Sequence, residues 1–466
     1  MTALKEYFDS VRGKSIYVIG MGVSNLPLIK MMLREGIKVT VCDRAERDQL
    51  SDQASELESL GAVLCLGPHY LDKIHRADVI FRTPGLSPNT PQLQKAVSRG
   101  AELTSEMELF LALCPCKTIA ITGSDGKTTT TTLISEFLKA AGYNVFVGGN
   151  IGKPLLPDLA GMTESDIAVL ELSSFQLMTM KKSPHIAVFT NLSPNHLDYH
   201  HTMEEYTAAK MNIYYHQSAS DRAIFNFDND VTRAMSKTAP AQTMLFSRRT
   251  RLEEGVYLRD DTIWLTNQMG SREVLPISMI RLPGQHNIEN YMAAIAAVDG
   301  LVPDKCVRSV AESFAGVEHR MEFVRQINGV RWYNDSIGSS PSRTIAGLSC
   351  FDDKIILIAG GYDKQIPFDA LGEEIARSVK QLILTGDTAQ KIASSVVSVP
   401  SFDPDALSIH IVDDLPAAVS LAHSSAVDGD VVVLSPACAA FDRFKNFMER
   451  GDTYKRLVSA LKELDL

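Results

Sequence analysis

The chain has 466 residues, of which 45% are apolar and 22% are charged, and its formal net charge is -10. This length is enough for about three globular domains, and the negative charge argues against a nucleic-acid or anionic-membrane partner that would need a broad basic face. No apolar run reaches the roughly 20 residues that span a bilayer. The N-terminus also lacks the apolar core of a signal peptide, so we expect a cytoplasmic protein.

Seven cysteines are scattered along the chain without the paired spacing of a zinc site or a disulfide framework. A reducing compartment is the simplest interpretation. Cys114-Pro-Cys116 could in principle ligate a metal ion, but no second pair or histidine lies nearby in the sequence. We therefore expect no metal at these cysteines.

Short apolar runs rich in β-branched residues alternate with helical patterns from end to end, which is typical of parallel sheets with crossover helices. The clear strand candidates lie at residues 15–20, 38–42, 118–122, 167–172, 186–191, 223–226, 354–359, 381–385 and 431–435. They fall into three groups, and charged turns between short alternating runs at 248–279 predict antiparallel strands within the middle group. We expect three domains, at residues 1–105, 106–316 and 317–466.

The first strand candidate leads into Gly20-Met-Gly-Val-Ser-Asn25, and the next strand candidate is followed by Asp43. This arrangement resembles a dinucleotide-binding fingerprint, in which glycines let the backbone approach a pyrophosphate. Asn25 stands where the third glycine is expected, so the match to an NAD site is weak. As a simpler alternative, the two glycines only turn a tight corner, and a nicotinamide oxidoreductase built on this domain is an alternative function.

A second glycine-rich turn follows the strand candidate at 118–122 and has the sequence Thr122-Gly-Ser-Asp-Gly-Lys-Thr128. Glycines let backbone N–H groups close around a phosphate, and the N-terminus of the following helix adds favourable partial charge. Lys127 can reach the terminal phosphates of ATP, and the Thr128 hydroxyl can bind magnesium. The loop is shorter than the common G-x4-G-K-[ST] form because position 121 is isoleucine. An ordinary strand-to-helix turn is the alternative.

Three further residues with suitable chemistry follow in the middle group of strands. Because a buried lone carboxylate is unfavourable, we expect Glu171 at the carboxyl end of its strand, where it can bind magnesium. His196 follows the strand candidate at 186–191 and offers a nitrogen ligand to a divalent ion. Each has a simpler alternative: Glu171 could be a helix cap or a surface acid, His196 a structural loop residue, and Lys210 a solvated charge.

Five motifs occur in a fixed order along the chain: T-G-S-D-G-K-T, E-L-S-S-F-Q, N-L-S-P-N-H-L-D, A-A-K and G-Q-H-N-I-E-N. In this order and spacing they resemble the Mur ligase superfamily, whose members make amide bonds by way of acyl phosphates. The resemblance covers essentially the whole chain, because residues 435–447 are similar to the C-terminal signature of the member that adds D-glutamate. It implies an α/β protein with a Rossmann-like N-terminal domain, a central P-loop ATPase-type domain with a mostly parallel sheet, and a Rossmann-like C-terminal domain.

The resemblance also implies ATP and metal contacts. Carried over to this sequence, the ATP contacts are Gly123, Ser124, Asp125, Gly126, Lys127, Thr128, Thr129, Asn287, Asn290, Arg320 and Asp335. Two magnesium ions would be bound by Thr128, Glu171, His196 and Lys210, and the catalytic residues would be Lys127, Glu171, His196 and Lys210. In the family the lysine that matches Lys210 is carbamylated by carbon dioxide, which converts a cation that would repel a metal into a carboxylate-like ligand.

Substrate contacts are implied in the same way. Those for the UDP-linked substrate are Gly22, Val23, Ser24, Asp43, Arg44, Pro84, Gly85, Asn150 and His196. Those for the acceptor D-glutamate are Ser339, Lys364, Ser435 and Phe444. The chain departs from the family at Ile337, where lysine is frequent, and at Ser339, where threonine is frequent. The isoleucine removes a cation that would contact a phosphate or a substrate.

The implied function is ATP-dependent ligation of D-glutamate to UDP-N-acetylmuramoyl-L-alanine in peptidoglycan precursor synthesis, with ADP and phosphate as products. The implied cofactors are ATP and Mg2+ at two sites, and the partners are small molecules bound by a monomer. The alternatives are another ligase of the superfamily, with a different acceptor amino acid or a folate substrate, and a nucleotide-binding protein that has lost the chemistry. The presence of Lys127, Glu171, His196 and Lys210 argues against lost chemistry.

Overall fold

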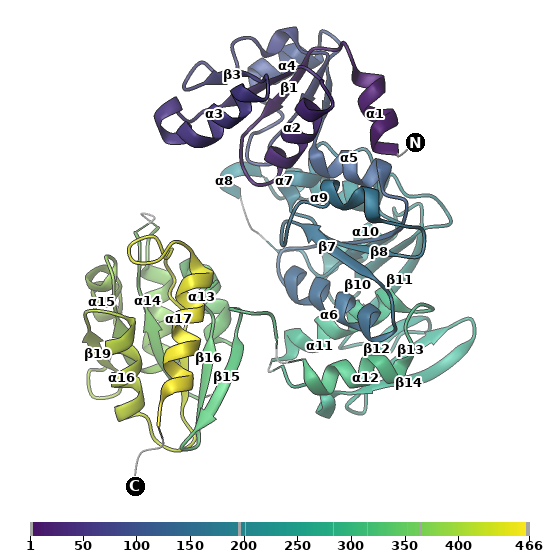
Figure 1. The fold of residues 1–466 in the computed structure, drawn as a ribbon. Helices are drawn as coiled ribbons and strands as arrows, with labels where there is room; N and C mark the ends of the chain where they lie inside the picture. Colours follow the sequence, from purple (N-terminus) through teal and green to yellow (C-terminus); the bar gives the residue numbers. More distant parts are fainter. Residues whose placement is uncertain are drawn as a thin grey trace. The chain divides into compact units, whose positions relative to one another are not determined.

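The computed structural model describes residues 3–193, 197–200, 202–282, 284–314, 316–351, 353–363 and 366–462, without the side chains of Ser51, Leu197 and Asp198. They form two compact units, one within Met1–Ile280 and Gln285–Glu312 and the other within Arg281–Gly284 and Ser313–Leu466. Figure 1 shows sheets flanked by helices in both units. Two sheets belong to the first unit and one to the second.

The first sheet is wholly parallel, with the strand order β3-β2-β1-β4-β5. Its elements are α1 (Ala3–Val11), β1 (Ile16–Ile19), α2 (Asn25–Arg34), β2 (Val39–Asp43), α3 (Ser51–Ser59), β3 (Val63–Leu66), β4 (Val79–Phe81), α4 (Pro91–Val97) and β5 (Glu102–Thr104). Every residue of β1 and β4 is buried, which explains their continuous apolar sequences. The strand order reverses between β1 and β4, so the loops after these two strands are adjacent at the edge where ligands bind in such sheets.

The second sheet has the order β14-β13-β12-β11-β10-β9-β6-β8-β7, parallel except at β12, β13 and β14. Its strands are β6 (Lys117–Thr122), β7 (Val145–Gly149), β8 (Ile167–Glu171), β9 (Ile186–Phe189), β10 (Arg222–Asn226), β11 (Gln242–Ser247), β12 (Gly255–Arg259), β13 (Thr262–Asn267) and β14 (Gly270–Pro276). Its helices are α5 (Glu106–Leu113), α6 (Lys127–Ala140), α7 (Ser174–Leu177), α8 (Leu197–His200), α9 (Met203–Tyr215), α10 (Asp230–Ser236), α11 (Gln285–Val298) and α12 (Asp304–Ser313). Helices α6 and α11 pack together (Figure 1).

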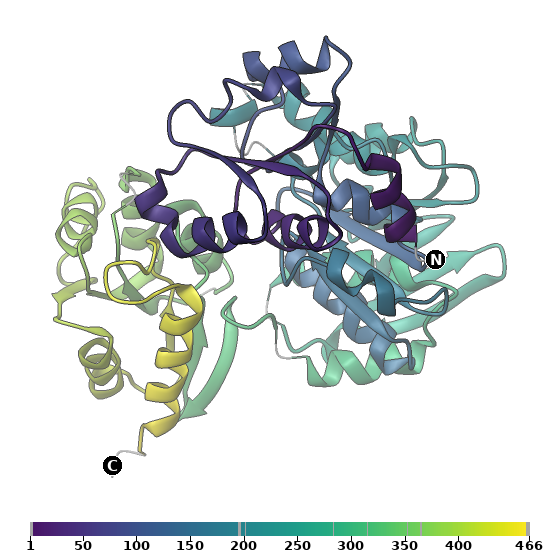
Figure 2. The same ribbon diagram turned by 45° about the horizontal axis from the view of Figure 1, so that its top comes forward.

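The third sheet has the order β15-β16-β20-β17-β18-β19 and is parallel apart from the β15–β16 hairpin. Its elements are β15 (Glu322–Ile327), β16 (Val330–Asn334), α13 (Pro341–Leu348), β17 (Ile355–Ala359), α14 (Asp369–Ser378), β18 (Val379–Leu384), α15 (Ala389–Val397), β19 (Ser408–Ile411), α16 (Leu415–Ser425), β20 (Val431–Leu434) and α17 (Phe447–Ala460). Figure 2 shows α17, in yellow, running beside β15 and β16. The central strands β17 and β20 are buried along their whole length.

The strand predictions are confirmed. Each strand candidate is a strand, with ends that shift by no more than two residues, and β12, β13 and β14 are the expected antiparallel strands. Several strands were not predicted. In the edge strand β19, polar residues with exposed and half-buried side chains interrupt the apolar run, whereas the buried strand β4 is only three residues long. No helix among the described residues has the length and apolar character to cross a bilayer.

Candidate active site

The glycine-rich turn at 122–128 connects β6 to α6, as predicted. Gly123 and Gly126 have φ angles of 148° and 78°, in the region that favours glycine. A Cβ on Gly123 would overlap Thr190 Oγ1, and a Cβ on Gly126 would overlap Asn290 Oδ1. Both glycines are therefore needed for the loop to lie this close to its neighbours.

Polar side chains after the adjacent strand β9 hold this loop. The Thr190 hydroxyl donates to the Asp125 carbonyl at 2.5 Å, and Asn191 Oδ1 accepts the Asp125 N–H at 2.9 Å. Ser124 Oγ donates to the Ser193 carbonyl at 2.9 Å. Helix α6 starts within the turn, so the positive end of its dipole faces the loop. The arrangement can hold a phosphate.

Glu171 is the last residue of β8, at the strand end where it was predicted, and is 2% exposed. Its carboxylate oxygens accept hydrogen bonds from Thr128 Oγ1 at 2.7 Å and from Asn150 Nδ2 at 2.8 Å. A hydroxyl and a carboxylate at this separation are hard oxygen donors that one magnesium ion can share. Thr128 and Glu171 therefore fit a magnesium site.

Two lysines donate to the carbonyl of Gly123, Lys127 Nζ at 3.1 Å and Lys210 Nζ at 2.9 Å. Lys210 also donates to Thr122 Oγ1 at 3.1 Å and is 1% exposed, so its interpretation as a solvated charge is wrong. Burial and, second, the Lys127 cation lower the pKa of Lys210 well below its usual value. A lower pKa leaves more neutral amine, the form that reacts with carbon dioxide. His196 lies outside the described residues.

Asn287 and Asn290 are buried on α11, and their side chains are linked by a hydrogen bond of 3.1 Å. Thr130 Oγ1 on α6 donates to Asn290 Oδ1 at 3.3 Å, which attaches α11 to the helix that follows the phosphate loop. Thr129 is buried on the same helix. The structure thus brings the predicted ATP residues of the first unit together around one loop.

The loop after β1 carries Gly22, Val23 and Ser24. The Val23 side chain is 76% exposed and so is accessible to a ligand. Asn25, in the position of the missing third glycine, donates from Nδ2 to the Ile19 carbonyl at 2.8 Å. This buried amide attaches the start of α2 to the end of β1, at the position where the third fingerprint glycine would allow close helix–strand packing.

Asp43, at the end of β2, shapes the same loop. Its two oxygens accept the backbone N–H groups of Met21 and Ala45, each at 2.9 Å. The neighbouring Arg44 is exposed. Asp43 therefore has a structural task at the predicted UDP site in addition to any ligand contact.

The loop after β4 contains Pro84 and Gly85 and is held by an arginine that the sequence patterns missed. Arg82 is 1% exposed, and its Nη1 donates to three carbonyls of residues 83–86 at distances from 2.6 to 3.2 Å. Its Nη2 donates to the Phe175 carbonyl in α7 at 2.7 Å. One guanidinium thus connects the loop after β4 of the first sheet to α7, the helix that follows β8 of the second sheet.

A pocket lies beside this loop. Its walls come from the loops after β1, β4 and β7, from the start of α5, and from Gln176 of α7. Glu106, the first residue of α5, also lines it and is 4% exposed. The sequence patterns did not identify Glu106 as a candidate site residue.

Burial raises the pKa of Glu106 from 4.5 to about 7, and the backbone N–H of Leu156 offsets part of that shift. Between these two values the folded protein keeps a proton that the unfolded chain releases, so stability decreases as the pH rises from 4.5 to 7. We expect Glu106→Gln to be more stable than the wild type at pH 8 by up to about 3 kcal/mol, and to lose this advantage at pH 4. Urea unfolding at both pH values measures the difference. Equal differences at the two pH values would contradict the shifted pKa.

Asp335 follows β16, and Ser435 follows the neighbouring strand β20. Ser435 Oγ donates to Asp335 Oδ2 at 2.6 Å, and the Met321 N–H donates to Oδ1 at 3.3 Å. Burial raises the pKa of Asp335 to about 6, although the Ser435 hydrogen bond and the Arg320 cation act against it. A predicted nucleotide contact and a predicted acceptor contact therefore meet in the second unit.

The other predicted acceptor residues lie in different loops of the second unit. Ser339 lies in the loop after β16, where Ile337 N–H donates to the His319 carbonyl at 3.1 Å. Phe444 lines a pocket together with the loop after β17. Lys364 lies outside the described residues.

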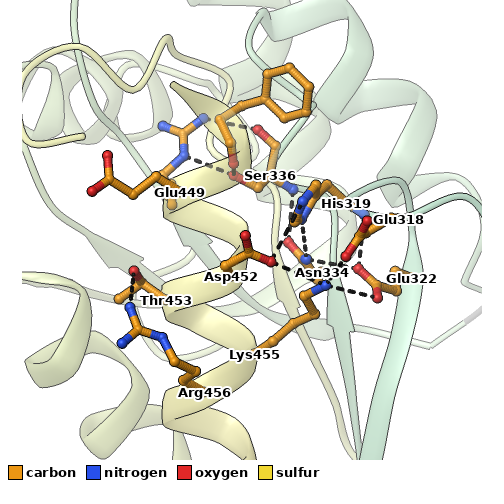
Figure 3. A network of polar contacts seen from close by, with 12 residues as sticks. Glu318, His319, Glu322, Asn334, Ser336, Glu449, Asp452, Thr453, Lys455 and Arg456 are labelled. Atoms are coloured by element: carbon orange, nitrogen blue, oxygen red, sulfur yellow. Dashed lines mark hydrogen bonds and ion pairs between the residues drawn. The ribbon is translucent and has the colours of Figure 1, made fainter. Parts of the chain in front are cut away.

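An ion-pair network supports the loop that carries Arg320. Lys455 on α17 forms ion pairs with Glu318, Glu322 and Asp452 at 2.5, 3.4 and 3.3 Å (Figure 3). Ligand atoms of Glu318, His319 and Asp452 lie within 4.8 Å of one another, a spacing that could suit a metal ion. The lysine ammonium already supplies the positive charge, so this cluster is better explained as a structural network than as a metal site.

Three protein-family models match successive parts of the chain. They are the Mur ligase MurD-like N-terminal domain at residues 14–105, the Mur ligase middle domain at 121–298, and the Mur ligase glutamate ligase domain at 319–438.

Similar curated proteins match over the full length. The UDP-N-acetylmuramoylalanine--D-glutamate ligase of Acetivibrio thermocellus is 48% identical over 463 residues, which are 99% of this chain and 99% of that protein. The ligase of the same name from Ruminiclostridium cellulolyticum is 47% identical over 462 residues, 98% of this chain and 99% of that protein.

Similar solved structures include MurF from Acinetobacter baumannii, with a TM-score of 0.62, 15% identity and 98% of each chain covered. MurF ligase from Thermotoga maritima in complex with ADP has a TM-score of 0.56 and 18% identity, covering 97% of this chain and 96% of that one. At these identities the likeness concerns the fold alone.

Proposed function

The chain belongs to the Mur ligase family, and from this premise we propose that it joins D-glutamate to UDP-N-acetylmuramoyl-L-alanine in peptidoglycan precursor synthesis, consuming ATP. The full-length relatives at 47–48% identity carry this activity in their names. The observation that carries the proposal is the set of contacts at one strand edge: Thr128 bonded to Glu171, with two lysines on the carbonyl of Gly123.

The reaction proceeds in two steps. The alanyl carboxylate attacks the γ-phosphorus of ATP, and ADP leaves. The neutral amine of D-glutamate then attacks the acyl phosphate carbon to give a tetrahedral intermediate, which loses inorganic phosphate and one proton from its nitrogen to form the amide. The protein contributes mainly positioning and electrostatics: the loop 123–128 and the start of α6 hold the phosphates, and Lys127 offsets charge on the transferred phosphoryl group.

Magnesium would be held by Thr128 and Glu171, whose oxygen donors suit it, and a second ion by His196 and carbamylated Lys210. When bound, these ions neutralise charge on the phosphates. Support for the carbamate comes from the burial of Lys210 and its lowered pKa, because reaction of a neutral amine with carbon dioxide gives a carbamate and a proton.

The substrate contacts are proposed at three strand edges. The UDP portion of the substrate is proposed to bind the loops after β1 and β4, together with Asp43, Arg44 and Asn150. Asn287 and Asn290 serve the adenine of ATP, and in the second unit Arg320 and Asp335 serve the nucleotide. For the acceptor we propose Ser339, Lys364, Ser435 and Phe444.

Acceptor specificity tests the proposed function directly. We expect phosphate release from ATP only when UDP-N-acetylmuramoyl-L-alanine and D-glutamate are both present, because the acyl phosphate needs an amine to complete the reaction. Steady-state phosphate release with D-glutamate, L-alanine or meso-diaminopimelate as acceptor measures this. Turnover with either of the latter two, and none with D-glutamate, would assign the chain to another acceptor.

We also propose domain boundaries near residues 105 and 316. The protein is proposed to be a cytoplasmic monomer whose partners are small molecules only. The boundaries are supported by the end of the first sheet at Thr104 and the start of the third at Glu322. The proposed location agrees with the scattered spacing of the cysteines, which predicts a reducing compartment.

A further inference from the structure

The pocket beside Arg82 lies between two groups of strand ends. On one side are the loops after β1 and β4, proposed to bind the UDP portion of the substrate. On the other side are the loop after β7 and helix α7, which follows Glu171 in the chain. A substrate with its nucleotide on the first side and its reacting carboxylate near Glu171 has its sugar in this pocket.

Two buried polar atoms on residues of this pocket lack a partner. Among the described residues, no group forms a hydrogen bond with Glu106 Oε1 or with Arg82 Nε. Both residues line the pocket, and they are 4% and 1% exposed. Buried polar groups in folded proteins are nearly always satisfied, because an unsatisfied one destabilises the protein. A ligand that enters the pocket can supply both missing partners.

The two atoms are chemically complementary to a sugar. Glu106 Oε1 accepts a hydrogen bond, whereas Arg82 Nε–H donates one. The other guanidinium nitrogens of Arg82 are fixed by the carbonyls of 83–86 and Phe175, so the direction of its Nε–H is fixed too. Hydroxyl groups and a secondary amide carry both a donor and an acceptor, and an N-acetylated sugar has both kinds of group.

We propose that Glu106 and Arg82 recognise the N-acetylmuramoyl sugar of the nucleotide substrate, with Glu106 accepting a hydrogen bond from it and Arg82 donating one. This inference rests on the proposed function, since it concerns the same substrate. Glu106 is a specificity residue in this view. Arg82 has a second, positioning task, because it also shapes the loop 83–86.

Glu106→Ala provides the test, because it leaves the Arg82 network untouched. The affinities of wild type and variant for UDP and for UDP-N-acetylmuramoyl-L-alanine are measured by titration. The ratio of the two affinities reports how much the part of the substrate beyond UDP contributes to binding in each protein. At pH 8, above the raised pKa of Glu106, the carboxylate is charged. There we expect the variant to bind the full substrate about 10-fold to 100-fold more weakly, as for loss of a hydrogen bond to a charged group, and UDP with unchanged affinity. In steady-state kinetics the KM for the nucleotide substrate rises, and those for ATP and D-glutamate do not.

Glu108→Gln is the matched control on the same helix. Glu108 is buried too, but its oxygens accept from Lys181 N–H at 2.7 Å and Thr104 Oγ1 at 3.3 Å. Its substitution is expected to lower the Tm without changing the affinity ratio of full substrate to UDP. Equal affinities of Glu106→Ala and wild type for the full substrate, or an equal loss for UDP, would overturn the inference. A wild type that binds the full substrate but does not ligate D-glutamate would instead overturn the proposed function.

Discussion

Replacing Lys210 with alanine is expected to lower kcat by about a thousandfold or more, a loss typical of removing a central electrostatic group. Lys210 is buried beside Gly123 and Lys127, and as a carbamate it would change from a repelling cation to a metal ligand. A short carboxylate such as acetate or formate fits the space that the shortened side chain leaves. We therefore expect these anions to restore part of the activity of Lys210→Ala, measured as phosphate release against carboxylate concentration.

Two measurements separate a carbamate from a structural lysine. Protein equilibrated with 13C-bicarbonate should give a carbamate carbon signal in the wild type that is absent from Lys210→Ala. The variant should keep a wild-type Tm to within a few degrees, which shows that it folds. Full activity of Lys210→Ala, or an inactive folded variant that no carboxylate rescues, would argue against the modified lysine.

Lys127→Ala is expected to reduce kcat/KM by about a thousandfold, because it removes the cation that we propose to offset charge on the transferred phosphoryl group. Lys127 lies at the start of α6, and its Nζ is 2.8 Å from the carbonyl of Ser124, within the phosphate loop. Binding of the UDP substrate should be unchanged, since its proposed contacts come from other loops. Phosphate release and a separate UDP-substrate titration measure the two effects.

Lys139→Ala is a matched control on the same helix. Lys139 lies in the last turn of α6 and pairs at the surface with Glu136, so its loss should alter kcat/KM by less than about twofold.

Acetate should not rescue Lys127→Ala, because Lys127 is proposed to act as a cation. A Lys127→Ala variant with near-normal turnover would contradict the assignment of the loop to ATP.

The sequence predicted the strands and the phosphate loop well because their signals are local. A continuous apolar run of five or six residues predicts a buried parallel strand, and glycines at 123 and 126 before a Lys-Thr pair predict the loop. Glu171 could be placed at a strand end because burial of an isolated carboxylate is unfavourable. The same reasoning applied to Val79-Ile-Phe-Arg82 would have found Arg82, which also ends an apolar strand.

The environment of Lys210 could not be predicted in this way. The surrounding Ala208-Ala209 indicates only a closely packed helix, and the burial of the lysine depends on Thr122 and Gly123, nearly ninety residues earlier in the chain. Glu106 was missed for a related reason. Acidic residues are common in the first turn of a helix, so only the pocket distinguishes it.

The phosphate loop has a further consequence, for the thermodynamics of nucleotide binding. Hydrogen bonds from Thr190 and to Asn191, both within the protein, fix the backbone of Asp125. The loop is therefore preorganised: its conformational entropy is lost when the chain folds, and association with ATP need not order it again. Substitutions at Thr190 or Asn191 would then weaken nucleotide affinity through loop disorder, from positions that need not contact the nucleotide.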